Sequence, residues 1–112
     1  MKNNRKIERI HLVDYLHVLD SSNDRLVGYL LDIHLHGLML AGLEPIKADS
    51  LFHLKVMLPE DIQGKSHFPI EASCRWCKKN SKEDWYDIGF KIIQIAREDI
   101  EIVRTFLPDS YF

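Results

Sequence analysis

The chain has 112 residues, of which 46% are hydrophobic, 29% charged and 10% aromatic. This length suits one hydrophobic core and is too short for two domains. The formal net charge of -2 argues against nucleic acid polymers as general partners. No apolar run approaches the roughly 20 residues that span a bilayer, and the basic start MKNNRKIERI lacks the apolar core of a secretory signal. We therefore expect one cytoplasmic domain without membrane insertion.

Six segments have the features of short strands separated by turns. In chain order, the expected strands are 10–19, 26–33, 38–43, 51–58, 68–76 and 88–92. The fourth is the clearest, because every second position holds a large apolar residue, namely Phe52, Leu54, Val56 and Leu58. The fifth alternates in the same way from Phe68 through Cys74 to Trp76. Turn-forming residue types predict connections at 21–24, 32–37, 44–50, 59–66 and 78–84.

The hydrophobic period changes to a helical one near the end of the chain. This change predicts a helix over about 96–107, with Glu98 and Asp99 near its positive end and Pro108 just beyond it. Ala96 is a poor N-cap, so the helix must depend on packing. Together these elements predict a mainly β fold. We expect a small closed or nearly closed barrel in residues 10–112, with the helix covering an open end or a strand edge, and a basic arm at 1–9.

Two polar motifs stand apart from the strand pattern. Arg5 and Arg9 are four residues apart, directly before the first expected strand. The segment Asp32-Ile33-His34-Leu35-His36-Gly37 follows the second strand, after a spacer of 22 residues (10–31). Each pattern is common by chance. Their order and spacing within a six-strand pattern are more specific.

With these motifs the chain resembles the PilZ family, which carries R-x-x-x-R, a similar spacer and then D/N-x-S-x-x-G. The resemblance continues through the turn at 45–51, the strand at 74–76, the segment at 87–90 and the terminal helix. It implies an antiparallel six-stranded PilZ-like β-barrel with a C-terminal α-helix. It also implies a receptor for the bacterial second messenger cyclic di-GMP, with the arm folding over the ligand. The implied ligand-binding residues are Arg5, Arg9, Asp32, His34 and Gly37.

The residue types suit this ligand. An arginine fork binds a phosphate, or the O6 and N7 acceptors of guanine, with two hydrogen bonds. The Asp32 carboxylate can accept from the adjacent N1–H and N2–H₂ donors of guanine. Gly37 permits a positive φ, which lets the backbone turn tightly beside a ligand. Ordering the arm costs roughly 1–2 kcal/mol per residue, which charge-assisted hydrogen bonds of about 1.5–3 kcal/mol can offset.

His34 occupies the serine position of the family motif. Imidazole is larger than a serine side chain and could crowd the guanine, or it could donate to a phosphate. We expect binding to be retained, because both arginines, Asp32 and Gly37 are present. His34 also supports an alternative, a degenerate PilZ adaptor that acts only through protein–protein contacts. Either form needs a protein partner, with motility, exopolysaccharide production (biofilm), adhesion and virulence as family-level roles, and either could be a monomer or a homodimer.

Zinc or redox chemistry at Cys74 and Cys77 is a competing interpretation of the sequence. Zinc needs four ligands, and no second cysteine pair exists. In a regular strand, positions three apart also point to opposite faces. Reduced thiols are therefore expected, although a metal-linked dimer through these cysteines or through His34 and His36 is a third alternative. Trp76 and Trp85 are expected to be packing residues. No catalytic motif is present, so neither an enzyme nor a cofactor is expected.

Overall fold

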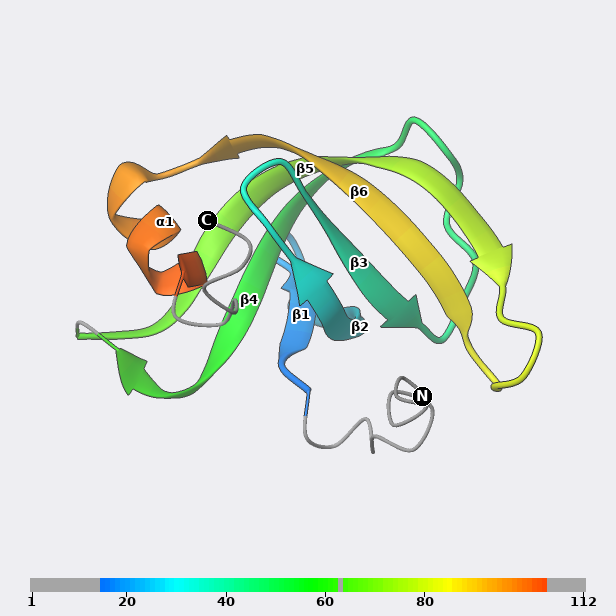
Figure 1. Ribbon diagram of the computed structural model, residues 1–112, viewed down its shortest axis with the longest axis horizontal. Helices are drawn as coiled ribbons and strands as arrows, with labels where there is room; N and C mark the ends of the chain where they lie inside the picture. Colours follow the sequence, from blue (N-terminus) through cyan, green and yellow to red (C-terminus); the bar gives the residue numbers. More distant parts are fainter. Residues whose placement is uncertain (1–14, 63, 105–112) are drawn as a thin grey trace, which may run out of the picture.

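The computed structural model describes residues 15–62 and 64–104, which form a closed six-stranded barrel and one helix (Figure 1). The elements are β1 (His17–Asp20), β2 (Arg25–Ile33), β3 (Gly37–Gly42), β4 (Leu51–Ile62), β5 (Lys65–Lys79), β6 (Tyr86–Ile95) and α1 (Arg97–Arg104). The strands pair in the order β1-β2-β3-β6-β5-β4, and every pair is antiparallel. The predicted six-stranded antiparallel β-barrel with a C-terminal helix is confirmed.

The barrel interior is filled by alternate side chains from all six strands. In β4, Leu54 and Val56 are fully buried, and they pair with the buried Ile70 and Phe68 of β5. Burying an aliphatic or aromatic side chain of this size contributes about 1.5–3 kcal/mol. The alternation predicted for the fourth strand is therefore correct, and its inward residues form part of a single core.

The first strand is shorter than predicted. It begins at His17, so Tyr15 and Leu16 precede it without being part of a strand, and residues 10–14 lie outside the described residues. The Leu30 N–H nevertheless donates to the Leu16 carbonyl over 2.8 Å. The chain therefore already lies against β2 when it enters the barrel.

Two connections are also shorter than predicted. The loop expected at 59–66 is wrong, because β4 continues to Ile62 and β5 begins at Lys65, next to Gly64 with a φ of 80°. Pro59 lies where the β4–β5 register shifts, between Met57 and Ile62, and a residue without an N–H is tolerated at such an irregularity. The turn expected at 78–84 narrows to 80–85, since β5 extends to Lys79.

Helix α1 lies beyond the end of β6, beside the tip of the β4–β5 hairpin (Figure 1). It buries Ile102 and Val103 in the core and places Asp99, which is 1% exposed, against Lys65 Nζ at 2.7 Å. This packing and ion pair compensate for the poor N-cap at Ala96. The helix ends at Arg104 within the described residues, so the predicted extension to 107 lies outside them. Within residues 15–62 and 64–104, no helix has the length and apolar character needed to cross a membrane.

Candidate functional site

A β-bulge in β2 determines which way Asp32 points. Leu30 pairs with Leu40 of β3, but Asp32 pairs with Met39, so Leu31 is an extra residue in β2. In a regular strand without the bulge, Asp32 would face the core as Leu30 does, because residues two apart share a face. With it, Asp32 is exposed on the outer surface of the barrel, and the following Ile33 is only 2% exposed. Bulges of this kind commonly redirect side chains at functional sites.

A second bulge in β5 has the same effect on Trp76. Cys74 pairs with Phe90 of β6, and Trp76 pairs with the preceding residue Gly89, so Arg75 is the extra residue. The predicted alternation placed Trp76 on the same face as Cys74, and this prediction is wrong. Cys74 is fully buried, whereas Trp76 is 43% exposed on the outside of the barrel.

The strand register places the two redirected side chains in one row. Asp32 lies opposite Met39, Met39 opposite Gly89, and Gly89 opposite Trp76, across β2, β3, β6 and β5. A Cβ atom on Gly89 would lie 2.3 Å from the Trp76 indole, so the ring rests directly on the Gly89 backbone. The result is a pocket of about 270 Å³, here called the wall pocket. It is lined by Asp32, His34, Leu38, Met39, Arg75, Trp76, Gly89 and Phe90.

The turn between β2 and β3 places the His34 ring beside Gly37, at the wall pocket. The His34 N–H donates to the Gly37 carbonyl over 2.9 Å, and the His36 N–H donates to His34 Nδ1 over 3.2 Å. Because Nδ1 accepts this bond, the proton of the neutral ring is on Nε2, which can donate to a ligand. The Ile92 N–H of β6 donates to the His36 carbonyl over 2.9 Å and fixes the turn to the barrel.

The reason for glycine at position 37 differs from the one predicted. Among the described glycines only Gly64 has a positive φ, so Gly37 does not use the left-handed conformation that glycine permits. Gly37 is the first residue of β3, and a Cβ atom there would lie 2.7 Å from the Phe90 carbonyl oxygen. Glycine is therefore required at position 37, because β6 approaches too closely for a side chain. The missing side chain also leaves space beside the His34 ring.

The structure brings together three of the five predicted site residues. Asp32 and His34 line the wall pocket, and Gly37 lies under the His34 ring. Arg5 and Arg9 lie outside the described residues, so their placement stays a prediction. Sequence reasoning missed Arg75 as a site residue and assigned Trp76 to packing alone. The missing signal was the β5 bulge, which a strict alternation pattern cannot reveal.

The same bulge overturns the argument used for the two cysteines. Cys74 is fully buried and Cys77 also packs against the core, so the two thiols do not point to opposite faces. Cys77 Sγ accepts the Ile46 N–H over 3.4 Å. Burial raises the pKa of the Cys74 thiol, which keeps it protonated at neutral pH. Within 15–62 and 64–104, no three histidine, cysteine or carboxylate side chains are grouped as a metal site would require.

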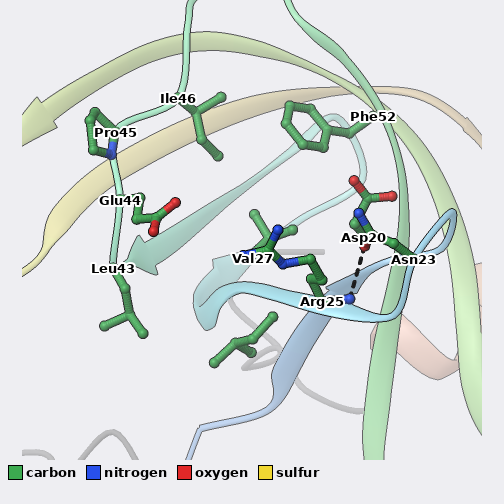
Figure 2. A pocket seen from close by; sticks show the side chains of 10 residues that line it. Asp20, Asn23, Arg25, Val27, Leu43, Glu44, Pro45, Ile46 and Phe52 are labelled. Atoms are coloured by element: carbon green, nitrogen blue, oxygen red, sulfur yellow. Dashed lines mark hydrogen bonds between the residues drawn. The ribbon is translucent and has the colours of Figure 1, made fainter.

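A larger pocket of about 520 Å³, here called the end pocket, lies between the β1–β2 turn and the segment after β3 (Figure 2). Phe52, Ile46 and Val27 contribute apolar surface to it, and Asp20, Arg25 and Glu44 are also part of its lining. Figure 2 shows the polar groups on separate elements around the opening.

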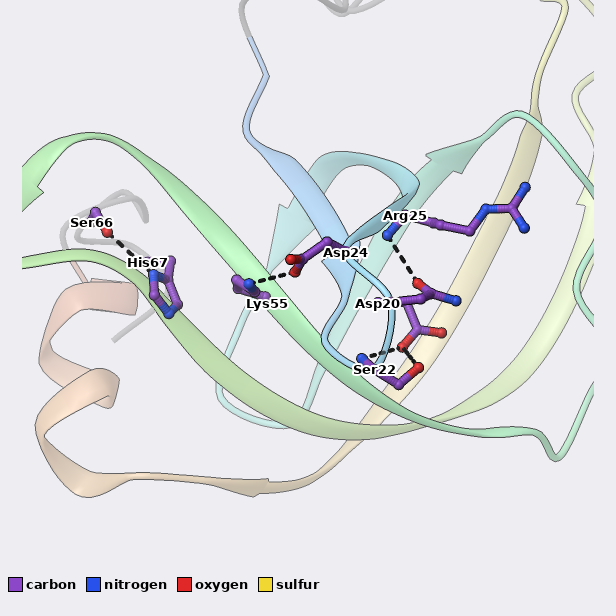
Figure 3. A network of polar contacts seen from close by, with 8 residues as sticks. Asp20, Ser22, Asp24, Arg25, Lys55, Ser66 and His67 are labelled. Carbon is purple, nitrogen blue, oxygen red and sulfur yellow. Dashed lines mark hydrogen bonds and ion pairs between the residues drawn. The ribbon is translucent and has the colours of Figure 1, made fainter.

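The acidic and amide side chains at the β1–β2 turn already have partners. Asp20 Oδ1 accepts from the Ser22 hydroxyl at 2.7 Å and from the Ser22 N–H at 2.9 Å, as Figure 3 shows. These two bonds hold the pKa of the Asp20 carboxyl below its ordinary value. Asn23 accepts from the Arg25 N–H over 2.9 Å, and Asp24 pairs with Lys55 at 2.6 Å. This network stabilises the turn. In the wall pocket, by contrast, no hydrogen bond from within the described residues reaches the Asp32 carboxylate.

Comparison with known proteins agrees with the fold and the motifs. The profile of the PilZ domain family matches residues 3–108. Among solved structures, the chain is similar to the Bacillus subtilis inhibitor of motility (MotI/DgrA), with a TM-score of 0.61 and 17% sequence identity. The match covers 82% of this chain and 44% of that protein, so this chain spans less than half of its length. No curated protein matches the chain significantly.

Proposed function

Because the chain belongs to the PilZ domain family, we propose that it binds cyclic di-GMP in the wall pocket and relays the level of this messenger to a partner protein. One observation carries the proposal. Two separate bulges turn Asp32 and Trp76 onto the same outer face, where the Trp76 ring lies over Gly89 and Met39 stands between Gly89 and Asp32 in the strand register. An acidic group and an exposed aromatic ring on one face are the groups that a guanine base needs.

Each group in the pocket has a distinct role toward the base. The Asp32 carboxylate would accept hydrogen bonds from guanine N1–H and N2–H₂, because no described residue donates a hydrogen bond to it. The Trp76 indole would stack on the base, and stacking of this kind contributes about 1–3 kcal/mol. The exposed Arg75 side chain would donate to guanine O6 and N7 or to a phosphate oxygen. We therefore add Arg75 and Trp76 to the proposed set of Asp32, His34 and Gly37.

The position where the chain enters the barrel supports a role for Arg5 and Arg9. The Leu16 carbonyl bonds the Leu30 N–H in β2, and Leu30 is two residues from Asp32. Arg9 precedes Leu16 by seven residues, a length that spans at most about 25 Å when extended. The tether is thus long enough for Arg9 to reach the wall pocket, and Arg5 has four more residues of reach. We expect Arg9→Ala to remove most of the binding, as measured by calorimetry.

The proposed output is a changed surface. Binding would order the arm at residues 1–9 over the ligand, and a partner would recognise the ordered form. The likeness to an inhibitor of motility makes a motility protein the first partner to test. We propose a cytoplasmic receptor without enzymatic activity or cofactor, acting as a monomer or a homodimer.

Isothermal titration calorimetry with cyclic di-GMP tests the proposal directly. We expect saturable binding at micromolar ligand and low salt, with GMP and GTP as controls that bind more weakly. The absence of any binding heat for the cyclic dinucleotide, under conditions where the protein is folded, would refute the receptor function.

One observation favours the adaptor alternative. His34 replaces the motif serine, and its Nδ1 is already occupied by the His36 N–H, which leaves one ring nitrogen for a ligand. If amide NMR spectra do not change on addition of cyclic di-GMP while a partner still binds the purified chain, the adaptor function is correct. Chemical-shift changes at the amides of Asp32, Gly37 and Gly89 would exclude it.

A further inference from the structure

Lys91 lies next to the wall pocket on the outer face of β6. It directly follows the inward-facing Phe90 and is exposed. It pairs with Gly37 of β3 on one side and with Ser73 of β5 on the other. Both neighbours are small, so no large cross-strand side chain covers Lys91 or competes for the space beside it.

The ammonium group of Lys91 has no anionic partner among the described residues. Lys55, Lys65 and Lys79 form salt bridges with carboxylates, whereas Lys91 forms none within 15–62 and 64–104. An exposed lysine is commonly solvated, so this fact alone indicates no site. What indicates a ligand site is the position of Lys91 opposite Gly37, which lies beside the His34 ring.

Gly37 separates two hydrogen-bond donors. The His34 ring lies on one side, with Nε2 at 3.7 Å from the place where a Cβ atom of Gly37 would be. Lys91 lies on the other side, directly opposite Gly37 in the β3–β6 ladder. Residues paired across an antiparallel ladder carry their side chains on the same face, so the Lys91 side chain leaves β6 on the face where Gly37 has none. An imidazole N–H and an ammonium group on a flexible stem, both starting beside this space, are suited to the oxygen atoms of a phosphate.

We propose that Lys91 and His34 bind one phosphate group of the ligand across Gly37. This inference rests on the proposed function. It places the guanine base of the ligand at Asp32 and Trp76 and a phosphate group of the ligand over Gly37. It also gives the imidazole of His34, at the serine position of the motif, a specific role. The ligand group is a phosphodiester within the dinucleotide, and inorganic phosphate would present the same oxygen atoms.

Calorimetry on the variants Lys91→Ala and Lys47→Ala tests the proposal. Lys47 is also an exposed lysine without a salt bridge among the described residues, but it lies after β3, beside the end pocket. We expect Lys91→Ala to raise the Kd for cyclic di-GMP by about tenfold, because a charge-assisted hydrogen bond is lost. Lys47→Ala is expected to bind like the parent, and Lys91→Arg to retain most of the affinity.

The outcome separates this inference from the proposed function. If the parent binds and Lys91→Ala binds as tightly, the phosphate site is wrong and the receptor function stands. If the parent does not bind the dinucleotide, amide NMR with millimolar inorganic phosphate decides. Shifts at the amides of Gly37 and Lys91 that disappear in Lys91→Ala would support an anion site, and unchanged amides would overturn it. Lys91 is exposed, so thermal unfolding should show the variant to be as stable as the parent.

Discussion

The wall pocket and the end pocket differ in size and in the state of their polar groups. The end pocket is about twice as large, at about 520 Å³ against about 270 Å³. Asp20, its acidic residue at the β1–β2 turn, is bonded twice by Ser22. In the wall pocket, the exposed Asp32 receives no such bond from any described residue. The difference indicates that Asp20 belongs to a self-contained turn, whereas Asp32 has hydrogen-bonding capacity left for a ligand.

The sharpest test of this comparison is a matched pair of aspartates. We expect Asp32→Ala to weaken cyclic di-GMP binding by at least about 100-fold, since it removes a charged acceptor of two guanine donors worth about 1.5–3 kcal/mol each. Asp20→Ala should leave binding unchanged and affect only the turn. Calorimetry on both variants measures the difference. Equal losses would show that the ligand does not distinguish the two pockets.

The next largest effect is expected from replacing the exposed side chain of Trp76. Trp76→Ala should weaken binding by about tenfold, because it removes a stacking surface worth about 1–3 kcal/mol. Leu43→Ala is the control, since Leu43 is an exposed apolar residue of the end pocket. Fluorescence offers a second measurement: in a Trp85→Phe background, the ligand should quench Trp76. Binding that leaves this emission unchanged would place the base elsewhere.

A matched pair of arginines should show a smaller effect. Both Arg75 and Arg25 are exposed, and each lines one of the two pockets. Exposed ionic contacts contribute about 0.2–1 kcal/mol, so we expect Arg75→Ala to weaken binding about twofold to fivefold. Arg25→Ala should have no effect on the Kd. A loss in the Arg25 variant alone would assign the ligand to the end pocket.

The smallest effect concerns the internal bonds of the end pocket. Ser22→Ala should raise the pKa of Asp20 toward its ordinary value, because the side-chain hydrogen bond to Oδ1 is the largest cause of its lowering. A carboxyl whose pKa is lowered in the folded state stabilises the fold above its unfolded pKa, and this stabilisation is lost as the pH falls through the folded pKa. The variant should therefore lose less stability on acidification. A carbon-detected NMR titration of Asp20 measures the shift directly.

The sequence was sufficient for the architecture and for the position of two candidate site residues. Alternation in β4 and the helical period after Ile95 correctly predicted the barrel and its helix, because both follow from burial of one face. The motif residues Asp32 and His34 both line the wall pocket, and their role toward a ligand stays a prediction. These features are local, so a pattern along the chain can reveal them.

The remaining part of the site depends on register, which a single sequence does not encode locally. One extra residue at Leu31 and another at Arg75 reverse the faces of everything that follows in each strand. Strict alternation therefore placed Trp76 inside and set the cysteines on opposite faces. The approach of the Phe90 carbonyl to Gly37 likewise involves β6, more than 50 residues along the chain. Such contacts become visible only after the strands are paired.

The location of the wall pocket on four hydrogen-bonded strands limits how a signal can leave the domain. Such a surface is stiff, because sliding one strand past another would break several ladder bonds at once. A ligand seated there would leave the cylinder unchanged in shape and alter only what covers its outside. Any downstream protein would then detect occupancy at the surface, and the barrel would serve as a rigid platform rather than as a hinge.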